Sequence, residues 1–272
     1  MPQDALTPFK AFERAGWEDI PLQYDEGFGR LTAQSVEPLL DAAGVRTAAR
    51  VLDVATGPGY VAAAAARRGA RTIAVDFSAA MVAEARRRHP GVDFREGDAE
   101  ALPFGDGSFD AVVMNYGLLH LARPDQAIAE AHRVLVPGGR FAFTVWDKPE
   151  RAIAFGIVLR AVELCGRMDV ALPPGPPFFR FSEAKECVDT LLAAGFRSPQ
   201  VGTVPQRWIL PSGDALFEIM AGGTVRTAGL LREQTRAART AVREAVCAAA
   251  EAYRKDGSIE LAMPAVLASA LR

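Results

Sequence analysis

The chain has 272 residues, of which 50% are hydrophobic and 24% are charged, and its formal net charge is -2. This length and composition are typical of one large globular domain, or of one domain with a substantial appendage, that buries its own core. The near-neutral charge argues against a nucleic-acid-binding protein, because the chain has no basic stripe to contact phosphates.

The cysteines and the hydropathy pattern bear on the cellular compartment. Cys165, Cys187 and Cys247 lie far apart and lack the C-x-x-C spacing of metal and redox sites. We therefore expect free thiols in a reducing compartment and no bound metal. Residues 1–6 have neither the basic nor the apolar segment of a signal peptide, and no apolar run approaches the roughly 20 residues that span a bilayer. These features predict a cytoplasmic protein that does not use a membrane.

The N-terminal half reads as a helical segment followed by alternating strands and helices. Before residue 50, Phe9, Phe12, Ala15 and Trp17 are spaced for one apolar helix face, which predicts a helix that packs on the core or covers a site as a flap. From about residue 50 the alternation is the signature of a parallel sheet covered on both faces. The expected strands are 50–54, 72–76, 92–96, 109–114 and 140–146, and the expected helices are 60–68, 79–88 and 124–135.

Capping residues support these helices. Ser78 is suited to cap the second helix and Pro124 to begin the third. The segment Pro137-Gly138-Gly139 is expected to end the third helix and to turn the chain into the next strand.

In the C-terminal part of the chain, the expected helices and strands no longer alternate regularly. Helices are expected near 152–166 and 182–194, with a proline-rich segment between them, and an extended stretch then reaches residue 210. A long helix is expected over 225–253, because apolar residues recur there every three or four positions. The end of the chain, 259–271, is expected to form a final strand at or near a sheet edge.

Residues 51–59 carry the strongest functional pattern. A short apolar run that contains Asp53 leads into a turn with two glycines and then into strong helix formers. This order predicts a buried strand, a tight turn and a helix N-terminus, an arrangement that presents bare backbone to a ligand. Gly57, Gly59 and Ala62 also match the dinucleotide fingerprint, with Asp76 near the position of the ribose-binding acid. This segment alone therefore also fits a nicotinamide or flavin enzyme.

Three further residues favour a different ligand. Pro58 lies inside the turn and has no N–H, which a loop that cradles a pyrophosphate would need. Asp98 follows the third strand, where a carboxylate can accept a hydrogen bond from an adenine amine. Asp53 can meet an ammonium group, and Asp76 can bind a diol. S-adenosyl-L-methionine has all three of these groups and a sulfonium.

Four blocks of the chain then resemble the class I S-adenosylmethionine-dependent methyltransferases, and most nearly their small-molecule branch that includes ubiquinone/menaquinone C-methyltransferases. The blocks are VLDVATGPGY, IAVDFSAAMVAEAR, FREGDAEALPFGDGSFDAVVMNYGLLHL and EAHRVLVPGGRFAFTVW, in the family's order. The resemblance implies an α/β, Rossmann-like fold: a seven-stranded, mostly parallel sheet whose last strand is antiparallel, with an N-terminal helical flap and a C-terminal helical cap. We expect a single domain over 1–272, with the flap at 1–49, the cofactor-binding core at 50–146, and the remaining strands and substrate cap at 147–272.

The resemblance also implies which residues bind S-adenosyl-L-methionine and its product S-adenosyl-L-homocysteine. These are Asp53, Ala55, Thr56, Gly57 and Gly59 around the methionine part, Asp76 at the ribose hydroxyls, Phe77 and Met81 against the adenine, Asp98 and Ala99 at the adenine edge, and Asn115 beside the methionyl group. Tyr24 from the flap is a further candidate for contact with the donor or the acceptor. Ala55 stands where a glycine is common in the family.

His120 is the candidate catalytic base, because it follows the fourth strand on the ligand-bearing edge of the sheet and an imidazole titrates near neutral pH. Its other possible role is to order that loop. The chain lacks the Asn/Asp-Pro-Pro-Tyr/Phe motif of amide and nucleobase methylation, so we expect C- or O-methylation of a small organic acceptor.

The acceptor pocket and the competing functions are less closely defined by the sequence. Residues that we expect to line an aromatic or isoprenoid-like acceptor are Phe178, Phe179, Trp208, Phe217 and Met220, with Trp146 at the same sheet edge. Two alternative functions stay open at this point: a nucleotide-dependent oxidoreductase, and a non-catalytic cofactor-binding protein of the same fold.

Overall fold

A seven-stranded sheet forms the centre of the protein in a computed structural model, which describes residues 7–272. Across the sheet the strands are β3 (Asp93–Glu96), β2 (Arg71–Asp76), β1 (Arg50–Val54), β4 (Phe109–Asn115), β5 (Leu135–Trp146), β10 (Ala265–Leu271) and β6 (Arg197–Val204). The first five pair in parallel, whereas β10 is antiparallel to both β5 and β6. The predicted Rossmann-like sheet, mostly parallel with an antiparallel last strand, is confirmed. Residues 1–6, from which we predicted the absence of a signal peptide, lie outside the described residues.

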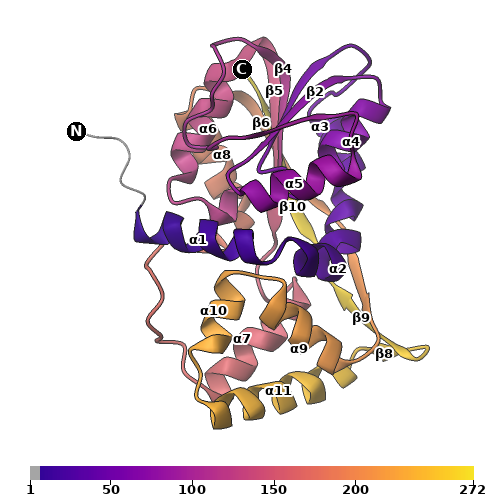
Figure 1. The fold of residues 1–272 in the computed structure, drawn as a ribbon, viewed down its shortest axis with the longest axis vertical. Helices are drawn as coiled ribbons and strands as arrows, with labels where there is room; N and C mark the ends of the chain where they lie inside the picture. Colours follow the sequence, from indigo (N-terminus) through magenta and orange to yellow (C-terminus); the bar gives the residue numbers. More distant parts are fainter. Residues whose placement is uncertain (1–6) are drawn as a thin grey trace.

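Helices cover both faces of the sheet. On one side lie α3 (Val36–Ala42), α4 (Tyr60–Arg67) and α5 (Ala79–Arg88), and on the other side α6 (Pro124–Val134) and α8 (Ala184–Ala193) (Figure 1). Successive residues of β1 point to opposite faces, so Val51 packs with α3 and α4 while Leu52 packs with α6. Ser78 caps α5 through the Met81 amide, and α6 begins at Pro124, as predicted.

The N-terminal helices lie between this sheet and a second cluster of helices. α1 (Pro8–Asp19) and α2 (Pro21–Thr32) cross the molecule there, and η1 (Ala33–Ser35) leads on into α3 (Figure 1). The cluster below them contains α7 (Ile153–Cys165), α9 (Gly213–Gly222), α10 (Arg226–Arg232) and α11 (Arg236–Glu251), with a small antiparallel sheet of β7 (Arg207–Leu210), β9 (Ser258–Ala262) and β8 (Arg254–Lys255). Because α2 contacts both α5 and α9, the N-terminal segment bridges the two parts.

The region 225–253, predicted as one long helix, forms two helices, so this prediction was wrong. The side chain of Gln234 bonds to the amide and the carbonyl of Arg167, and Thr235 accepts a backbone hydrogen bond that caps α11. These polar side chains compete with the helical backbone and turn the chain between α10 and α11. Ala249, one of the apolar residues of the three- and four-residue spacing on which this prediction rested, is exposed.

The region 259–271, predicted as one strand, divides into two strands that belong to different sheets. Pro264 lies between β9 and β10 and has no N–H to continue a ladder. β9 pairs with β7 and β8, whereas β10 pairs on both sides in the main sheet. β10 thus lies near the edge of the sheet, as expected, but it is covered by β6.

The segment Pro137-Gly138-Gly139 has a different role from the one predicted. α6 already ends at Val134 and β5 begins at Leu135, so the three residues lie within the strand. Gly138 has a φ of +81°, and the pairing of β5 with β4 changes register here. The segment therefore forms a local irregularity of the bulge type, which glycine permits.

No helix within residues 7–272 combines the length and the apolar character needed to cross a membrane. In the same range, no group of three or more His, Cys, Asp or Glu side chains is arranged to hold a metal ion. The three cysteines are free thiols.

Candidate active site

The turn between β1 and α4 has the left-handed backbone that its glycines indicate. Ala55, Gly57 and Gly59 have φ values of +54°, +53° and +88°. A Cβ on Gly59 would lie 2.7 Å from Cζ of Phe94, whereas a Cβ on Gly57 would meet no atom within 4 Å. Gly59 is therefore required for packing, and Gly57 leaves open space where the turn faces the cavity.

Asp53 is buried beneath this turn. Its Oδ2 accepts hydrogen bonds from Thr56 Oγ1 at 2.6 Å and from the amide of Ala62 at 3.0 Å. Its Oδ1 is buried and has no partner among the described residues. Burial raises the pKa of Asp53 to about 7, against the effect of the two hydrogen bonds. The free oxygen is thus an acceptor that a donor group of a ligand, or a water molecule, can satisfy.

Asp76 ends β2 and faces the same turn. Its Oδ2 accepts from the amide of Gly57 at 2.8 Å, and its Oδ1 accepts from the amide of Ser78 at 3.0 Å. Burial raises the pKa of Asp76 to about 6. Because each carboxylate oxygen has a second lone pair, the fixed side chain can still accept two hydrogen bonds from a diol.

Asp98, just beyond β3, is tied to the N-terminal helix. Lys10 of α1 contacts the Asp98 carboxylate, and its Nζ lies 2.9 Å from Oε2 of the buried Glu100. Oδ1 of Asp98 accepts from the amide of Glu100 at 2.9 Å. Lys10, which was not among the predicted site residues, links the first helix to the region expected to hold an adenine.

Asn115, at the end of β4, is fixed by protein partners. Its amide oxygen accepts from Ser35 Oγ at 2.8 Å and from Thr144 Oγ1, and its nitrogen donates to the carbonyl of Thr32 at 3.2 Å. The next residue, Tyr116, has a φ of +57°, which is uncommon for a side chain of this size. Such backbone strain concentrates at functional sites, where the surrounding structure enforces it.

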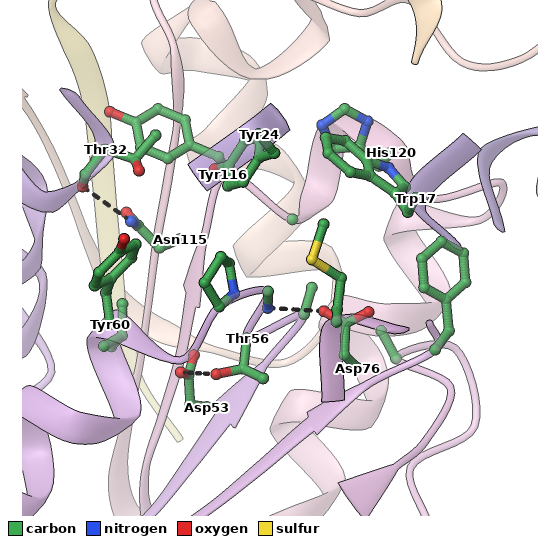
Figure 2. Close-up of a pocket in the computed structure, with 18 of the residues that line it drawn as sticks. Trp17, Tyr24, Thr32, Asp53, Thr56, Tyr60, Asp76, Asn115, Tyr116 and His120 are labelled. Carbon is green, nitrogen blue, oxygen red and sulfur yellow. Dashed lines mark hydrogen bonds between the residues drawn. The ribbon is translucent and has the colours of Figure 1, made fainter. Parts of the chain in front are cut away.

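The residues predicted to bind a cofactor surround one cavity (Figure 2). Those that line it are Tyr24, Asp53, Ala55, Thr56, Gly57, Asp76, Phe77, Met81, Asp98, Ala99 and Asn115, together with the predicted base His120. Gly59 alone of the predicted set is absent from the lining, because it packs against Phe94. Lining residues that the sequence analysis did not single out include Trp17, Thr32, Tyr60 and Tyr116.

A second cavity adjoins the first. Trp17, Tyr24, Tyr116 and His120 line both cavities. The remaining walls are formed by four aromatic residues, Phe28, Trp146, Phe155 and Phe178, and by the segment 223–227, which includes Arg226. The two cavities therefore meet at a ring of aromatic side chains that includes His120.

The predicted acceptor-pocket residues lie in different places. Phe178 lines the second cavity, and Phe179 packs on Phe178 with 4.9 Å between ring centroids but does not line it. Trp208, Phe217 and Met220 are buried and line neither cavity, so their assignment to the pocket lining was wrong. Hydrophobicity alone does not distinguish a residue that lines a cavity from one that packs behind it.

His120 is held by the N-terminal helix. It ends η2 (Leu118–His120), and its Nδ1 lies 3.0 Å from Oε2 of Glu13. The indole N–H of Trp17 donates to the same oxygen at 3.1 Å, and the Trp17 and His120 rings meet edge to face at 4.8 Å. Figure 2 shows Trp17 and His120 together at one side of the cavity, opposite Asp53.

Glu13 was missed by the sequence analysis, although a signal for it exists. Phe9, Glu13 and Trp17 follow one another every fourth residue, so an acid stands in the middle of the predicted apolar face of the helix. All three are buried, whereas Ala15, which was placed on that face, is exposed. An ionisable residue on the buried face of a helix is a useful indication of a functional contact.

Comparison with known proteins assigns the core of the chain to the methyltransferases that its sequence blocks resemble. A methyltransferase-domain family model matches residues 52–143. A demethylmenaquinone methyltransferase of Renibacterium salmoninarum is 43% identical over 111 residues, which are 41% of this chain and 47% of that protein. The protein of the same name from Streptomyces avermitilis is 33% identical over 158 residues, which are 54% of this chain and 67% of that protein. The chain spans about half the length of the first curated relatives that it matches.

A solved structure shows the same fold over the whole chain. Phosphoethanolamine N-methyltransferase 2 of Haemonchus contortus, in complex with S-adenosyl-L-methionine, has a TM-score of 0.59 at 18% sequence identity, over 100% of this chain and 61% of that one. These comparisons do not favour the alternative of a nucleotide-dependent oxidoreductase. From its core sequence and its sheet order, the chain belongs to the class I S-adenosylmethionine-dependent methyltransferases.

Proposed function

We propose that this protein transfers the methyl group of S-adenosyl-L-methionine to a small aromatic acceptor, at carbon or oxygen. The observation that carries the proposal is the junction of the two cavities. A donor in the first cavity and an acceptor in the second would meet at Trp17, Tyr24, Tyr116 and His120, which line both. Methyl transfer needs such a contact, because the nucleophile must approach the methyl carbon in line with its bond to sulfur.

The residues around the first cavity fit the groups of this cofactor. The unpartnered Oδ1 of Asp53 can accept from the ammonium group, directly or through water. Asp76 can accept from both ribose hydroxyls, and Asp98 can accept from the adenine amine. Gly57 leaves room for the methionine chain, because nothing within 4 Å occupies the position of its absent Cβ.

The protein itself does not need to activate the methyl group for this reaction. S-adenosyl-L-methionine, when bound, supplies a methyl group already activated by the sulfonium. The protein orients the acceptor and excludes water, and such positioning is worth roughly 7–11 kcal/mol in favourable cases. His120 accepts the proton of the acceptor hydroxyl. In O-methylation, the electron pair left on oxygen forms the new bond to the methyl carbon. In C-methylation, that pair forms a C=O bond, a ring π pair forms the C–CH₃ bond, and the methylated ring carbon then loses its own proton to solvent, which restores the aromatic ring. In both cases the S–CH₃ pair returns to sulfur.

The walls of the second cavity favour an aromatic acceptor. The rings of Phe28, Trp146, Phe155 and Phe178 offer apolar and stacking contacts, and His120 is the proton acceptor among them. The demethylmenaquinone methyltransferase names of the relatives support a hydroxylated aromatic ring, with an isoprenoid-like substituent as a variant of it. The free thiols support a reducing compartment such as the cytoplasm, and the net charge of -2 supports a small molecule rather than a nucleic acid as the partner.

Calorimetry with S-adenosyl-L-homocysteine tests the donor site, and NAD and NADP serve as the matched comparison. We expect binding of S-adenosyl-L-homocysteine only; binding of the nicotinamide cofactors instead would overturn the proposal. A panel of hydroxylated benzenes and naphthalenes, with and without a prenyl chain, then tests the acceptor by mass spectrometry. Gain of one methyl group by a panel member supports the proposal, whereas cofactor binding with no methylated product across the panel would favour a non-catalytic protein.

A further inference from the structure

We infer that Glu13 is a positioning residue, whose carboxylate orients His120, the proton-accepting group of the site. The pair of Glu13 and His120 forms only when α1 is docked on the core. The inference rests on the proposed function, because it concerns the base that the proposed acceptor would meet. His120 is on the sheet domain, after β4, whereas Glu13 comes from the N-terminal helix. The core therefore supplies the proton acceptor, and the flap supplies the carboxylate that orients it.

The geometry around Glu13 is specific. Its Oε2 receives both the Trp17 indole N–H at 3.1 Å and the contact with His120 Nδ1 at 3.0 Å. The Glu13 side chain is 0% exposed, and the His120 side chain is 18% exposed. The His120 ring is also flanked by Phe178, with 6.0 Å between the ring centroids. His120 thus has one nitrogen committed to Glu13 and few alternative orientations.

This contact selects the tautomer of the neutral imidazole. A carboxylate only accepts hydrogen bonds, so the nitrogen that faces Glu13 must carry the proton. Nδ1 is then the donor, and Nε2 keeps the lone pair that a general base needs. Without Glu13, the ring is free to adopt the other tautomer, in which Nε2 cannot accept a proton.

Packing alone does not explain a carboxylate at this position. A buried polar group costs free energy unless it is hydrogen-bonded, and an apolar residue would pack at lower cost between Phe9 and Trp17. Moreover, Oε1 of Glu13 is buried without a partner among the described residues. The residue keeps one unsatisfied oxygen while the other one holds His120, which indicates a functional rather than a structural role.

The other charged groups around the pair come from different elements. Arg226 of α10 attracts Glu13 electrostatically, and its guanidinium lies over the rings of Phe9 and Phe178 at 5.1 and 5.4 Å from their centroids. Asp76 of β2 interacts electrostatically with His120. The removal of Glu13 alone therefore leaves Asp76 as the nearby negative charge.

Other residues of α1 dock the helix independently of Glu13. Lys10 contacts Asp98 and Glu100, and the carboxylate of Glu18 accepts from the amides of Ala79 and Ala80 at 2.8 and 2.9 Å. Glu18 therefore provides a matched control, because it is an acid of the same helix that contacts the core but not His120.

The test compares Glu13→Gln and Glu13→Ala with Glu18→Gln in the full-length protein. The first readout is the ¹⁵N spectrum of the imidazole groups, which needs no acceptor and is simple because the chain has only three histidines. We expect the Nδ1-protonated tautomer of His120 in the wild type and in Glu18→Gln, and a mixture or the other tautomer in Glu13→Ala. A His120→Asn variant assigns the signal.

The second readout is kinetic and uses the panel compound that is methylated fastest. Because positioned proton transfer typically contributes 10²–10⁴-fold, we expect kcat to fall at least about 10-fold in both Glu13 variants, with KM changed less than about threefold. Glu18→Gln should keep the wild-type kcat.

The outcomes separate the two proposals. Failure of the wild type to bind S-adenosyl-L-homocysteine would remove the proposed function itself. Wild-type binding of this ligand together with an Nδ1-protonated His120 in Glu13→Ala would overturn the inference and leave the function standing. An equal loss of kcat in Glu13→Gln and Glu18→Gln would also overturn it, since the helix would then act only as a lid.

Discussion

Binding of S-adenosyl-L-homocysteine should be coupled to the ionisation of Asp76. The buried side chain has its pKa raised to about 6 by burial, above the ordinary value of an aspartate. The ribose hydroxyls must donate to the ionised form, so binding favours the deprotonated carboxyl. Lowering the pH from 7.5 to 5.0 should therefore protonate Asp76 in the free protein and weaken binding.

The size of this effect follows from the pKa. With a pKa of about 6 in the free protein, only about one tenth of the molecules have an ionised Asp76 at pH 5, so affinity should fall about 10-fold relative to pH 7.5, or about 1.4 kcal/mol. At pH 5, about 0.9 proton should be released from this group for each ligand bound. Asp53, with its pKa raised to about 7, adds a second and separate dependence.

Isothermal titration calorimetry measures both quantities, in buffers that differ in ionisation enthalpy. In Asp76→Asn we expect affinity at pH 7.5 to fall about 10–100-fold, because hydrogen bonds to a charged acceptor are worth about 1.5–3 kcal/mol. The variant should also lose the part of the pH dependence centred near 6, whereas Asp53→Asn should keep it. Denaturant unfolding of each free variant shows whether its fold is retained.

Two results would refute this reasoning. One is a profile of affinity against pH that is the same in the wild type and in Asp76→Asn. The other is proton uptake, rather than release, on binding at pH 5. Either result would mean that Asp76 does not accept hydrogen bonds from the ligand.

Two other perturbations give distinct results. Gly57→Ala and Gly59→Ala each put a methyl group on a left-handed backbone at a cost of about 1–2 kcal/mol, but only the second also drives a Cβ to within 2.7 Å of Phe94. Denaturant unfolding should therefore show that Gly59→Ala lowers the free energy of unfolding by about 1–3 kcal/mol more than Gly57→Ala does. Calorimetry should show the greater loss of S-adenosyl-L-homocysteine affinity for Gly57→Ala. Equal free energies of unfolding in the two variants would contradict the packing argument. Between pH 5 and pH 8, the raised pKa of Asp53 means that the folded state binds the extra proton, so the stability of the free protein should fall with rising pH by about 2–3 kcal/mol from this group. Asp53→Asn should flatten that slope in urea titrations, and an unchanged slope would assign it to other groups.

Local sequence was sufficient where a structure depends on neighbours along the chain. The strand at 50–54, the cap at Ser78 and the glycine turn were predicted correctly, because strand propensity, capping and left-handed backbone are properties of short segments. Alternating strands and helices also determine a parallel sheet, because a crossover connection has few possible geometries. The side chains at the strand ends, such as Asp53 and Asp76, then meet at one edge of the sheet.

Only the tertiary structure decided which residues from distant segments come together. Periodicity placed Trp17 on a packing face, but it does not show that α1 crosses the sheet edge and brings Glu13 to His120, which is 107 positions away. It likewise did not separate Phe178, which lines the second cavity, from Trp208, which packs behind it. The physical reason is that burying an apolar side chain is favourable at either location. A hydrophobic pattern therefore indicates that a side chain is removed from water, but not which residues or which cavity it contacts.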